Sequence, residues 1–366
     1  MSNSQEKKRV IILGANGYIG CSLYFQCKDN QYNVLGVDNG LKERNLREIG
    51  ASSLKWCRGP AELDKLDIST EYKYLKEIIQ GFRPDVIVNL AQQPSAPFSF
   101  IDANHATETQ RNNIMGGLNV LWAVKEVNPD IHIIQLGTAG EYPDWLYPQH
   151  IEIPESSRIK VKYQNVDWEI PTPRYFGSWY HASKMYSSFN ADYACRIWGL
   201  RVTDINQGIV YGHTEDAGFW YDYYFGTVYN RFIVQAVLGI PLTVYGTGDQ
   251  MRSFININNS IQAIDLLINN PPEKGEYRII QQLTELYTIN QIADMVSRLT
   301  GAKIEYYDNP RAEMKENKFK FEAKKLKTLG LQTIPMQHEL TKTIKMVQEN
   351  KENIVPSSME LKTKWN

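Results

Sequence analysis

The segment RVIILGANGYIG, residues 9–20, decides the fold because an apolar run ends directly in a glycine-rich turn. The run RVIIL predicts a strand buried on both faces. Gly14, Gly17 and Gly20 then form a GxxGxxG motif, a variant of the dinucleotide-binding fingerprint. Glycines there allow a tight turn and a close approach of a pyrophosphate to the next helix N-terminus. By itself the motif is weak evidence, because a plain strand-to-helix turn is also compatible with it, so the rest of the chain has to decide.

Three more short apolar runs follow, at residues 33–37 (NVLGV), 85–90 (DVIVNL) and 131–136 (IHIIQL). Helix-length segments separate them, which indicates parallel strands covered on both faces. With right-handed crossovers, this pattern predicts an α/β fold with a Rossmann-like doubly wound parallel sheet. From residue 206 onward the pattern is less regular and predicts a smaller, interleaved C-terminal α/β substrate domain.

Asp38 follows the second run, 18 residues after Gly20. An acid at this place hydrogen-bonds the adenosine ribose hydroxyls and repels a 2′-phosphate, so NAD(H) is favoured over NADP(H). Together with the strands on either side, this predicts NAD as cofactor. Asp67 and Ile68 follow a further polar-to-apolar transition. They either cap the adenine or form an ordinary helix N-cap.

The composition is that of an ordinary globular protein, with 366 residues, 42% of them hydrophobic, and a formal net charge of -1. This balance predicts neither a nucleic acid nor a membrane as partner. Four dispersed cysteines without a CxxC pair and six dispersed histidines predict no bound metal and a cytoplasmic enzyme with reduced thiols. The start MSNSQEKKRV lacks a signal-peptide core, and no run approaches the roughly 20 apolar residues of a membrane span.

A candidate reaction centre lies in SWYHASK, where Tyr180 and Lys184 form a YxxxK pair. Positions four apart share one face of a helix. A nearby ammonium lowers the tyrosine pKa, and the tyrosinate then takes the proton of a sugar hydroxyl while hydride leaves for NAD. Thr138, at the end of the fourth apolar run, would hydrogen-bond the same oxygen.

The order of these motifs resembles the extended short-chain dehydrogenase/reductases, the NAD-dependent epimerase/dehydratase family. Residues 89–91 (NLA), 112–119 (NNIMGGLN) and 245–252 (YGTGDQMR) match its other marks. The resemblance implies a nucleotide-sugar substrate, whose diphosphate Arg252 approaches, and a homodimer formed through the helices that hold Asn113 and Tyr180. The expected cofactor-binding residues are Gly14, Asn16, Gly17, Tyr18, Ile19, Gly20, Asp38, Asn39, Asp67, Ile68, Leu90, Ala91, Asn113, Tyr180, Lys184 and Gln207.

Within that family, several stretches are similar to the UDP-sulfoquinovose synthases, among them QPSAPFSFID, GTAGEY, NQGIVYG, FGTVYNRF and LTVYGTGDQMR. The likeness implies oxidation of UDP-glucose at C4 by NAD, elimination across C5–C6 and addition of a sulfite equivalent from a donor. It places Thr138, Glu141, Tyr180 and Lys184 on catalytic positions. The expected substrate-binding residues are Gln93, His181, Asn206, Asn230, Thr243, Arg252 and Arg311.

The domain organisation follows from the same reading. Residues 1–208 are expected to form the NAD-binding Rossmann domain, with residues 254–271 returning to it. Within it, RIKVKYQNVDWEIP alternates around Gln164-Asn165 and predicts an inserted β-hairpin near residues 151–173. Residues 209–253 and 272–349 are expected to form the nucleotide-sugar-binding domain, and residues 350–366 a polar tail.

Pro94 departs from the resembled synthases, which carry an arginine directly before Ser-Ala-Pro. A missing cation weakens the case for sulfite, because a small anion needs one. His181, Arg174 and Lys162 are candidates to replace it.

Three alternatives to the sulfite reaction stay open. A UDP-sugar 4-epimerase needs Thr138, Tyr180 and Lys184 but no further base. Ordinary 4,6-dehydratases carry an Asp-Glu pair after the threonine, where this chain has Ala139 and Gly140. A non-catalytic NAD-binding sensor or scaffold is the third. Glu141 is either a base at C5 or a residue that fixes its loop.

Overall fold

The central sheet of the molecule is parallel and doubly wound. The computed structural model describes residues 7–48, 50, 52, 63–142, 151–216, 218–310 and 320–360. Within these residues, seven strands form one sheet in the order β13-β9-β5-β4-β1-β2-β3. They are β1 (Arg9–Leu13), β2 (Asn33–Asp38), β3 (Leu63–Lys65), β4 (Val86–Asn89), β5 (His132–Leu136), β9 (Arg201–Gln207) and β13 (Tyr277–Gln282). The strand order reverses beside β1, which confirms the predicted Rossmann-like fold.

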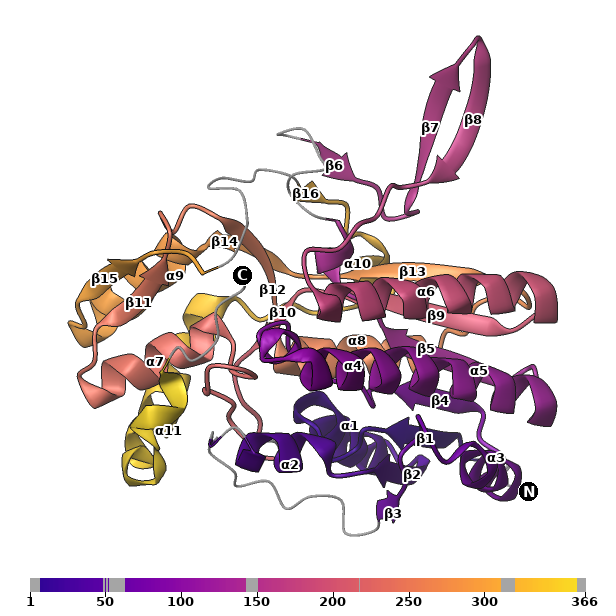
Figure 1. Cartoon of the computed structure of the whole chain (residues 1–366), viewed down its shortest axis with the longest axis horizontal. Helices are drawn as coiled ribbons and strands as arrows, with labels where there is room; N and C mark the ends of the chain where they lie inside the picture. The colour runs from indigo at the N-terminus through magenta and orange to yellow at the C-terminus, as the bar shows by residue number, and fades with distance from the viewer. Residues whose placement is uncertain are drawn as a thin grey trace.

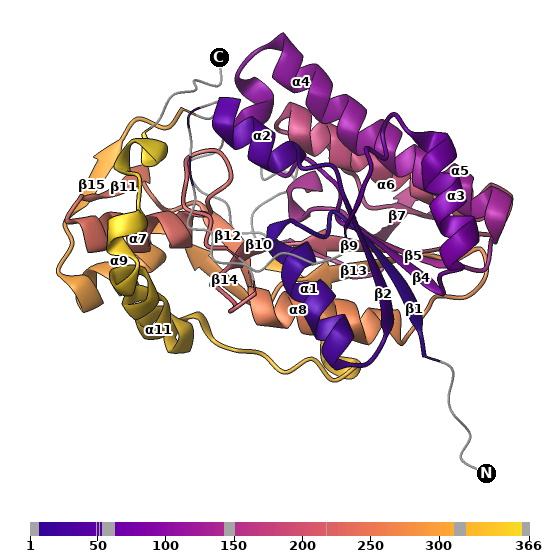
Figure 2. The same ribbon diagram turned by 90° about the horizontal axis from the view of Figure 1, so that it is seen from below.

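Helices cover both faces of this sheet (Figure 2). Along β1, Val10 and Ile12 face one apolar core while Ile11 and Leu13 face the other, so the strand is buried on both sides as its composition predicts. The helices α1 (Tyr18–Asp29) and α8 (Ile257–Ile268) cover the first core. The helices α3 (Tyr72–Phe82), α5 (Gly116–Val127) and α6 (Trp179–Trp198) cover the second.

A second lobe has its own apolar core and lies beside the carboxyl ends of the large sheet (Figure 1). One small sheet is formed by β10 (Ile209–Tyr211), β12 (Met251–Asn256) and β14 (Glu285–Thr288), and another by β11 (Leu242–Tyr245) and β15 (Ile304–Tyr307). The helices α7 (Val228–Leu238), α9 (Ile289–Thr300) and α11 (Met336–Glu349) pack on them. The remaining elements include α2 (Leu41–Glu48), α4 (Ala103–Gln110), β6 (Glu152–Ile153), β16 (Lys320–Phe321) and α10 (Lys325–Thr328).

Two expected boundaries are wrong. The second domain was expected to resume at residue 272, yet β13 pairs with β9 and so extends the large sheet to Gln282. The C-terminal segment is not loosely held between residues 350 and 359, because Ile354 and Met359 are buried. Its backbone is also fixed, since Val355 N donates to the Tyr221 hydroxyl at 2.9 Å.

The expected hairpin is present as β7 (Arg158–Tyr163) and β8 (Val166–Pro171), which pair antiparallel. Gln164 and Asn165 form the turn, both with positive φ (49° and 64°), as a tight two-residue hairpin requires. Figure 1 shows this hairpin projecting from the body of the molecule. In the part of the chain that the structure describes, no helix has the length and apolar character to cross a membrane.

Candidate active site

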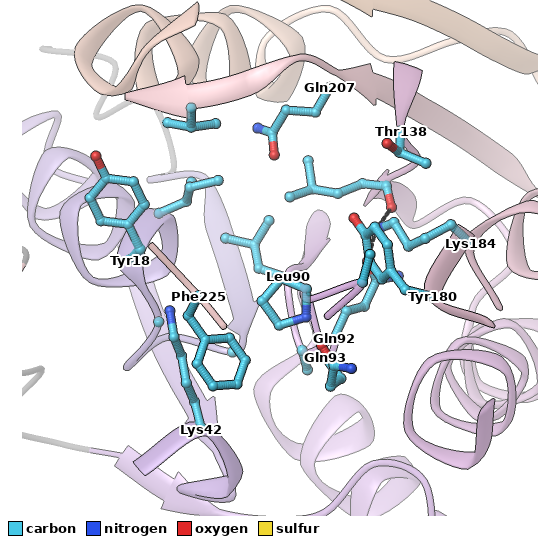
Figure 3. A pocket seen from close by; sticks show the side chains of 18 of the residues that line it. Tyr18, Lys42, Leu90, Gln92, Gln93, Thr138, Tyr180, Lys184, Gln207 and Phe225 are labelled. Atoms are coloured by element: carbon cyan, nitrogen blue, oxygen red, sulfur yellow. Dashed lines mark hydrogen bonds between the residues drawn. The ribbon is translucent and has the colours of Figure 1, made fainter. Parts of the chain in front are cut away.

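A cavity of about 610 Å³ lies at the carboxyl ends of the central strands, between the two lobes. This is where open α/β sheets bind their ligands. Figure 3 shows Thr138, Tyr180 and Lys184 at one side of it and Tyr18 and Lys42 at the other. The predicted site residues that line it are Gly14, Asn16, Gly17, Tyr18, Ile19, Gly20, Asp38, Asn39, Ile68, Leu90, Ala91, Gln93, Thr138, Tyr180, His181, Lys184, Gln207 and Arg252.

The glycine turn has the shape that a dinucleotide needs. Gly14 has a φ of +81°, and a Cβ there would lie 2.6 Å from the backbone carbon of Leu90, so only glycine fits. A Cβ on Gly20 would lie 2.1 Å from the Gly14 carbonyl oxygen. Asp38 Oδ2 accepts a hydrogen bond from Asn16 N at 3.0 Å, which holds the carboxylate beside the turn. The residues present therefore fit NAD, held by this turn and by Asp38.

The reacting end is built on the first turn of α6. Ser178 caps the helix, and its Oγ lies 3.1 Å from His181 N and 2.8 Å from His181 Nδ1. Tyr180 and Lys184 follow on one face, as their spacing predicts. Opposite them, Thr138 ends the loop after β5, and its Oγ1 accepts a hydrogen bond from Gly140 N at 3.1 Å. Burial raises the pKa of Tyr180, and a hydrogen bond with the Thr138 side chain partly offsets this.

Lys184 is almost completely buried, and its ammonium donates to Gln92 Oε1 and to the Leu136 carbonyl oxygen. Burial lowers the pKa of Lys184 to about 8, although the carboxylates of Asp204 and Glu141 act in the opposite sense. The YxxxK spacing predicted that this ammonium lowers the pKa of Tyr180. In the protein by itself, that expectation is wrong, because the ammonium is engaged by other acceptors and burial dominates at Tyr180.

Glu141 lies behind the cavity wall. Its side chain is fully buried, and Oε2 forms an ion pair with Arg174 Nη1 at 2.8 Å. Ser188 Oγ donates to Oε1 at 3.2 Å. Burial raises the pKa of the Glu141 carboxyl, and Arg174 offsets part of that shift. Glu141 is absent from the described residues that line the cavity, so the geometry favours its role in fixing the loop over direct contact with substrate.

Three other predicted residues make structural contacts away from the cavity lining. Asp67 Oδ1 accepts from Ser69 N and Oγ in the turn before α3. The N-cap of α3 is Glu71, so the helix N-cap alternative for Asp67 is wrong. Asn230 Nδ2 donates to the Trp220 carbonyl oxygen at 2.9 Å. Thr243 Oγ1 accepts from Gln235 Nε2 at 2.8 Å. None of the three is among the described residues that line the cavity, and their contact with cofactor or substrate stays a prediction.

Two predicted asparagines are buried beneath the site. Asn113 lies in a π-helical turn, Arg111–Met115, which turns its side chain inward. Asn206 Nδ2 donates to the Tyr142 hydroxyl at 3.2 Å. Neither is among the described residues that line the cavity. Arg311 lies outside the described residues.

The three candidates to replace an arginine at position 94 differ in whether they reach the cavity. Arg174 is committed to Glu141, and Lys162 lies on the projecting hairpin. His181 alone among the three lines the cavity.

Gln92 and Lys42 are two of the cavity-lining residues that were not predicted from the sequence. Gln92 follows β4 and accepts from Lys184. Lys42 lies with its ammonium 3.5 Å from the centroid of the Trp220 ring. Gln92 could have been predicted from its position, since side chains just after a parallel strand face the ligand crevice. No spacing in the sequence pairs Lys42 with Trp220.

Gly140 gives a test of the reacting end. A Cβ there would lie 2.4 Å from His181 Nε2, so Gly140→Ala displaces the imidazole. Because displacements of about 1 Å can cost up to 10²-fold, we expect turnover to fall by about 10- to 100-fold, with the fold intact. Steady-state rates and a thermal melt check this. Gly81→Ala, where a Cβ meets nothing within 4 Å, is the matched control. An unchanged rate in Gly140→Ala would contradict a working role for His181 in its present position.

Comparison with known proteins identifies the family. Residues 10–281 match the NAD dependent epimerase/dehydratase family. The chain belongs to this family. UDP-sulfoquinovose synthase from Sulfolobus acidocaldarius is 38% identical over 348 residues, covering 88% of this chain and 88% of the relative. The chloroplastic UDP-sulfoquinovose synthase of Spinacia oleracea is 35% identical over 356 residues, covering 90% of this chain and 73% of the relative. Both parts of the sequence resemblance are thereby confirmed.

Solved structures agree on the fold. A UDP-glucose 4-epimerase from Thermotoga maritima, crystallised with UDP-glucose, superposes with a TM-score of 0.71 over 93% of this chain and 99% of that one. At 18% identity this likeness shows the fold alone. Family membership and the two synthase relatives make the chain an NAD-dependent enzyme of the epimerase/dehydratase type.

Proposed function

We propose that the chain makes a UDP-sulfonated sugar from UDP-glucose and sulfite, as a UDP-sulfoquinovose synthase. The observation that carries this is the synthase name of both relatives, which match nearly the whole chain. The site supports it, because Thr138, Tyr180 and Lys184 line one cavity with the glycine turn.

The site residues divide the work as follows. NAD, held by the glycine turn and Asp38, would supply a reversible hydride acceptor for C4 of the sugar. Tyr180 in its ionised form takes the proton of the C4 hydroxyl on Oη, while Thr138 Oγ1 hydrogen-bonds the same sugar oxygen. Lys184 supplies positive charge beneath them. Oxidation at C4 acidifies the C5 hydrogen, and His181, which lines the cavity next to Gly140, is better placed than Glu141 to move protons at C5 and C6.

A sulfite donor is part of this proposal. Although Pro94 stands where the resembled synthases have arginine, the cavity is lined by other cationic side chains. These are Lys42, Lys184 and Arg252, together with His181 when it is protonated. An anion therefore does not depend on position 94 for a counter-charge.

Dehydration without sulfite addition is disfavoured, because this chain has Ala139 and Gly140 in place of the acid pair and position 140 has no room for an acidic side chain. An acidic side chain at position 140, as in ordinary dehydratases, would meet His181, since even a Cβ lies 2.4 Å from its Nε2. The 4-epimerase reaction needs only residues that are present, so it is the second candidate function.

The deciding experiment follows the sugar by NMR in deuterium oxide, with UDP-glucose, with and without sulfite. Deuterium at C5 and a sulfite-dependent C6 product are expected. UDP-galactose without deuterium would instead establish epimerisation. NAD release on denaturation with no turnover of any UDP-sugar would favour a sensor or scaffold. His181→Gln is expected to abolish C5 exchange, whereas Glu141→Gln should retain it in whatever fraction stays folded.

We also propose a homodimer through α5 and α6. The outer face of α6 exposes Tyr186, Phe189, Tyr193 and Ile197 at helical spacing, with exposed fractions between 41% and 55%. An apolar stripe of this kind marks a partner surface. We expect light scattering to give twice the chain mass of 42.2 kDa. Tyr193→Glu should give monomers. A monomeric wild-type protein at micromolar concentration would contradict the proposal.

The division into an NAD-binding and a nucleotide-sugar-binding domain stays a proposal, with the first extended to Gln282. A cytoplasmic location is likewise proposed, on the ground that Cys27 and Cys195 are buried thiols outside any disulfide.

A further inference from the structure

Gln92 lies beside Lys184 and accepts a hydrogen bond from its ammonium. It follows β4 by three residues, and the Gln92 amide nitrogen donates to the Leu90 carbonyl oxygen at 2.8 Å, which fixes the turn. Its side-chain Oε1 accepts from the Lys184 ammonium. The other acceptor of that ammonium is the Leu136 carbonyl oxygen. Both partners are neutral, so no carboxylate contacts the buried cation directly in the described part of the chain.

Asn113 locks this arrangement in place. Its Oδ1 accepts from Gln93 N at 2.7 Å, and its Nδ2 donates to Gln93 O at 3.1 Å and to Ser183 Oγ at 2.8 Å. One buried side chain thus clamps the residue after Gln92 to the residue before Lys184. The distance between Gln92 and Lys184 is therefore set by packing rather than by their own flexible side chains.

We propose that Gln92 is a positioning residue that, as a neutral hydrogen-bond acceptor, holds the Lys184 ammonium beside the reacting tyrosine. The positioning role itself does not depend on the proposed function; only the use of the Lys184 charge in the reaction rests on it. The amide oxygen has to face Lys184, because an ammonium has protons to donate and no lone pair to accept. A charged acceptor at position 92 would instead fix the lysine in its protonated form.

The groups that face Lys184 come from three elements. Tyr180 lies on its own helix, with the ammonium 6.0 Å from the ring centroid. Asp204 on β9 and Glu141 after β5 act through space and favour the charged form. Asp204 accepts from Tyr277 and Gln135, and Glu141 is paired with Arg174. Burial opposes both carboxylates, and the balance leaves the pKa of Lys184 at about 8. A change at position 92 therefore acts on a group that is already close to titration.

Position 92 allows a clean substitution. Gln92 Nε2 is buried and has no hydrogen-bond partner in the described residues. Gln92→Glu therefore loses no bond to the protein and adds one charge beside the ammonium. Gln92→Met removes the acceptor with little change in volume.

The test measures the titration of Lys184 in the NAD-bound enzyme without substrate. Lysine is labelled with 13C at Cε, and the Lys184 signal is assigned by its loss in Lys184→Arg. We expect the midpoint to rise by about 1 to 3 units in Gln92→Glu and to fall in Gln92→Met. Gln348→Glu, which makes the same change at an exposed position of α11 outside the cavity lining, should leave the midpoint where it is.

The pH profile of kcat gives a second readout. The limb of the profile that reflects titration of Lys184 should shift in the same order. Its midpoint pH should be lowest in Gln92→Met, intermediate in the unaltered protein and highest in Gln92→Glu. If both variants lower turnover at every pH and leave the Lys184 midpoint unmoved, Gln92 is merely structural and the proposal is overturned. The titration requires no substrate, so its result can be interpreted even if the proposed function is wrong.

Discussion

Tyr180→Phe should lower kcat by about 10³-fold or more, which is among the largest effects expected in this enzyme. General acid–base groups contribute about 10² to 10⁴ in rate, and the removed hydroxyl is the proposed proton acceptor for the oxidised sugar carbon. Burial raises the pKa of this phenol and the hydrogen bond with the Thr138 side chain partly offsets that shift, so its proton transfer depends on Thr138. The measurement is the single-turnover rate at which the C4-oxidised sugar appears.

Binding should survive this change. The ring and Lys184 remain, so NAD content after denaturation is expected to match that of the unaltered protein. Tyr74→Phe is the matched control, because that tyrosine is 42% exposed on α3, far from the cavity lining. Turnover within about tenfold of normal in Tyr180→Phe would remove the tyrosine from the proton-transfer role and leave Thr138 or His181 to supply it.

The sequence predicts the fold well because the decisive features are local. The run RVIIL and the turn after it determine the first strand and the dinucleotide approach, and the structure has both as expected. Apolar strands buried on two faces need no knowledge of distant residues to be recognised. The extension of the first sheet by β13 was missed because its pairing with β9 joins residues about 75 apart in the chain.

The site is predictable only where a motif fixes it. Tyr180 and Lys184 follow from their spacing, and Thr138 from the end of a strand. By contrast, the role of Glu141 depends on Arg174, 33 residues further along, and that of Gln92 on Lys184, 92 residues away. A loop carboxylate looks the same in sequence whether it faces substrate or an arginine. Only the packed structure shows which partner it has.

Arg174→Met is therefore expected to have the largest effect on stability, about 3 to 5 kcal/mol in the free energy of unfolding. Removing one partner of a buried ion pair leaves the other charge without compensation. The Arg174 side chain is 6% exposed and that of Glu141 is fully buried, so water cannot replace the lost partner. Glu141 would then take up a proton, since burial already raises its pKa. Urea unfolding at neutral pH measures the loss.

The double variant Glu141→Gln with Arg174→Met separates structure from chemistry. Two neutral side chains need no counter-charge, so much of the lost stability should return. If Glu141 only fixes the loop after β5, the double variant should regain C5 exchange along with stability, because Thr138 and His181 return to their places. Recovery of stability without any C5 exchange would show that the carboxylate itself is needed in the reaction, and would restore Glu141 as a base.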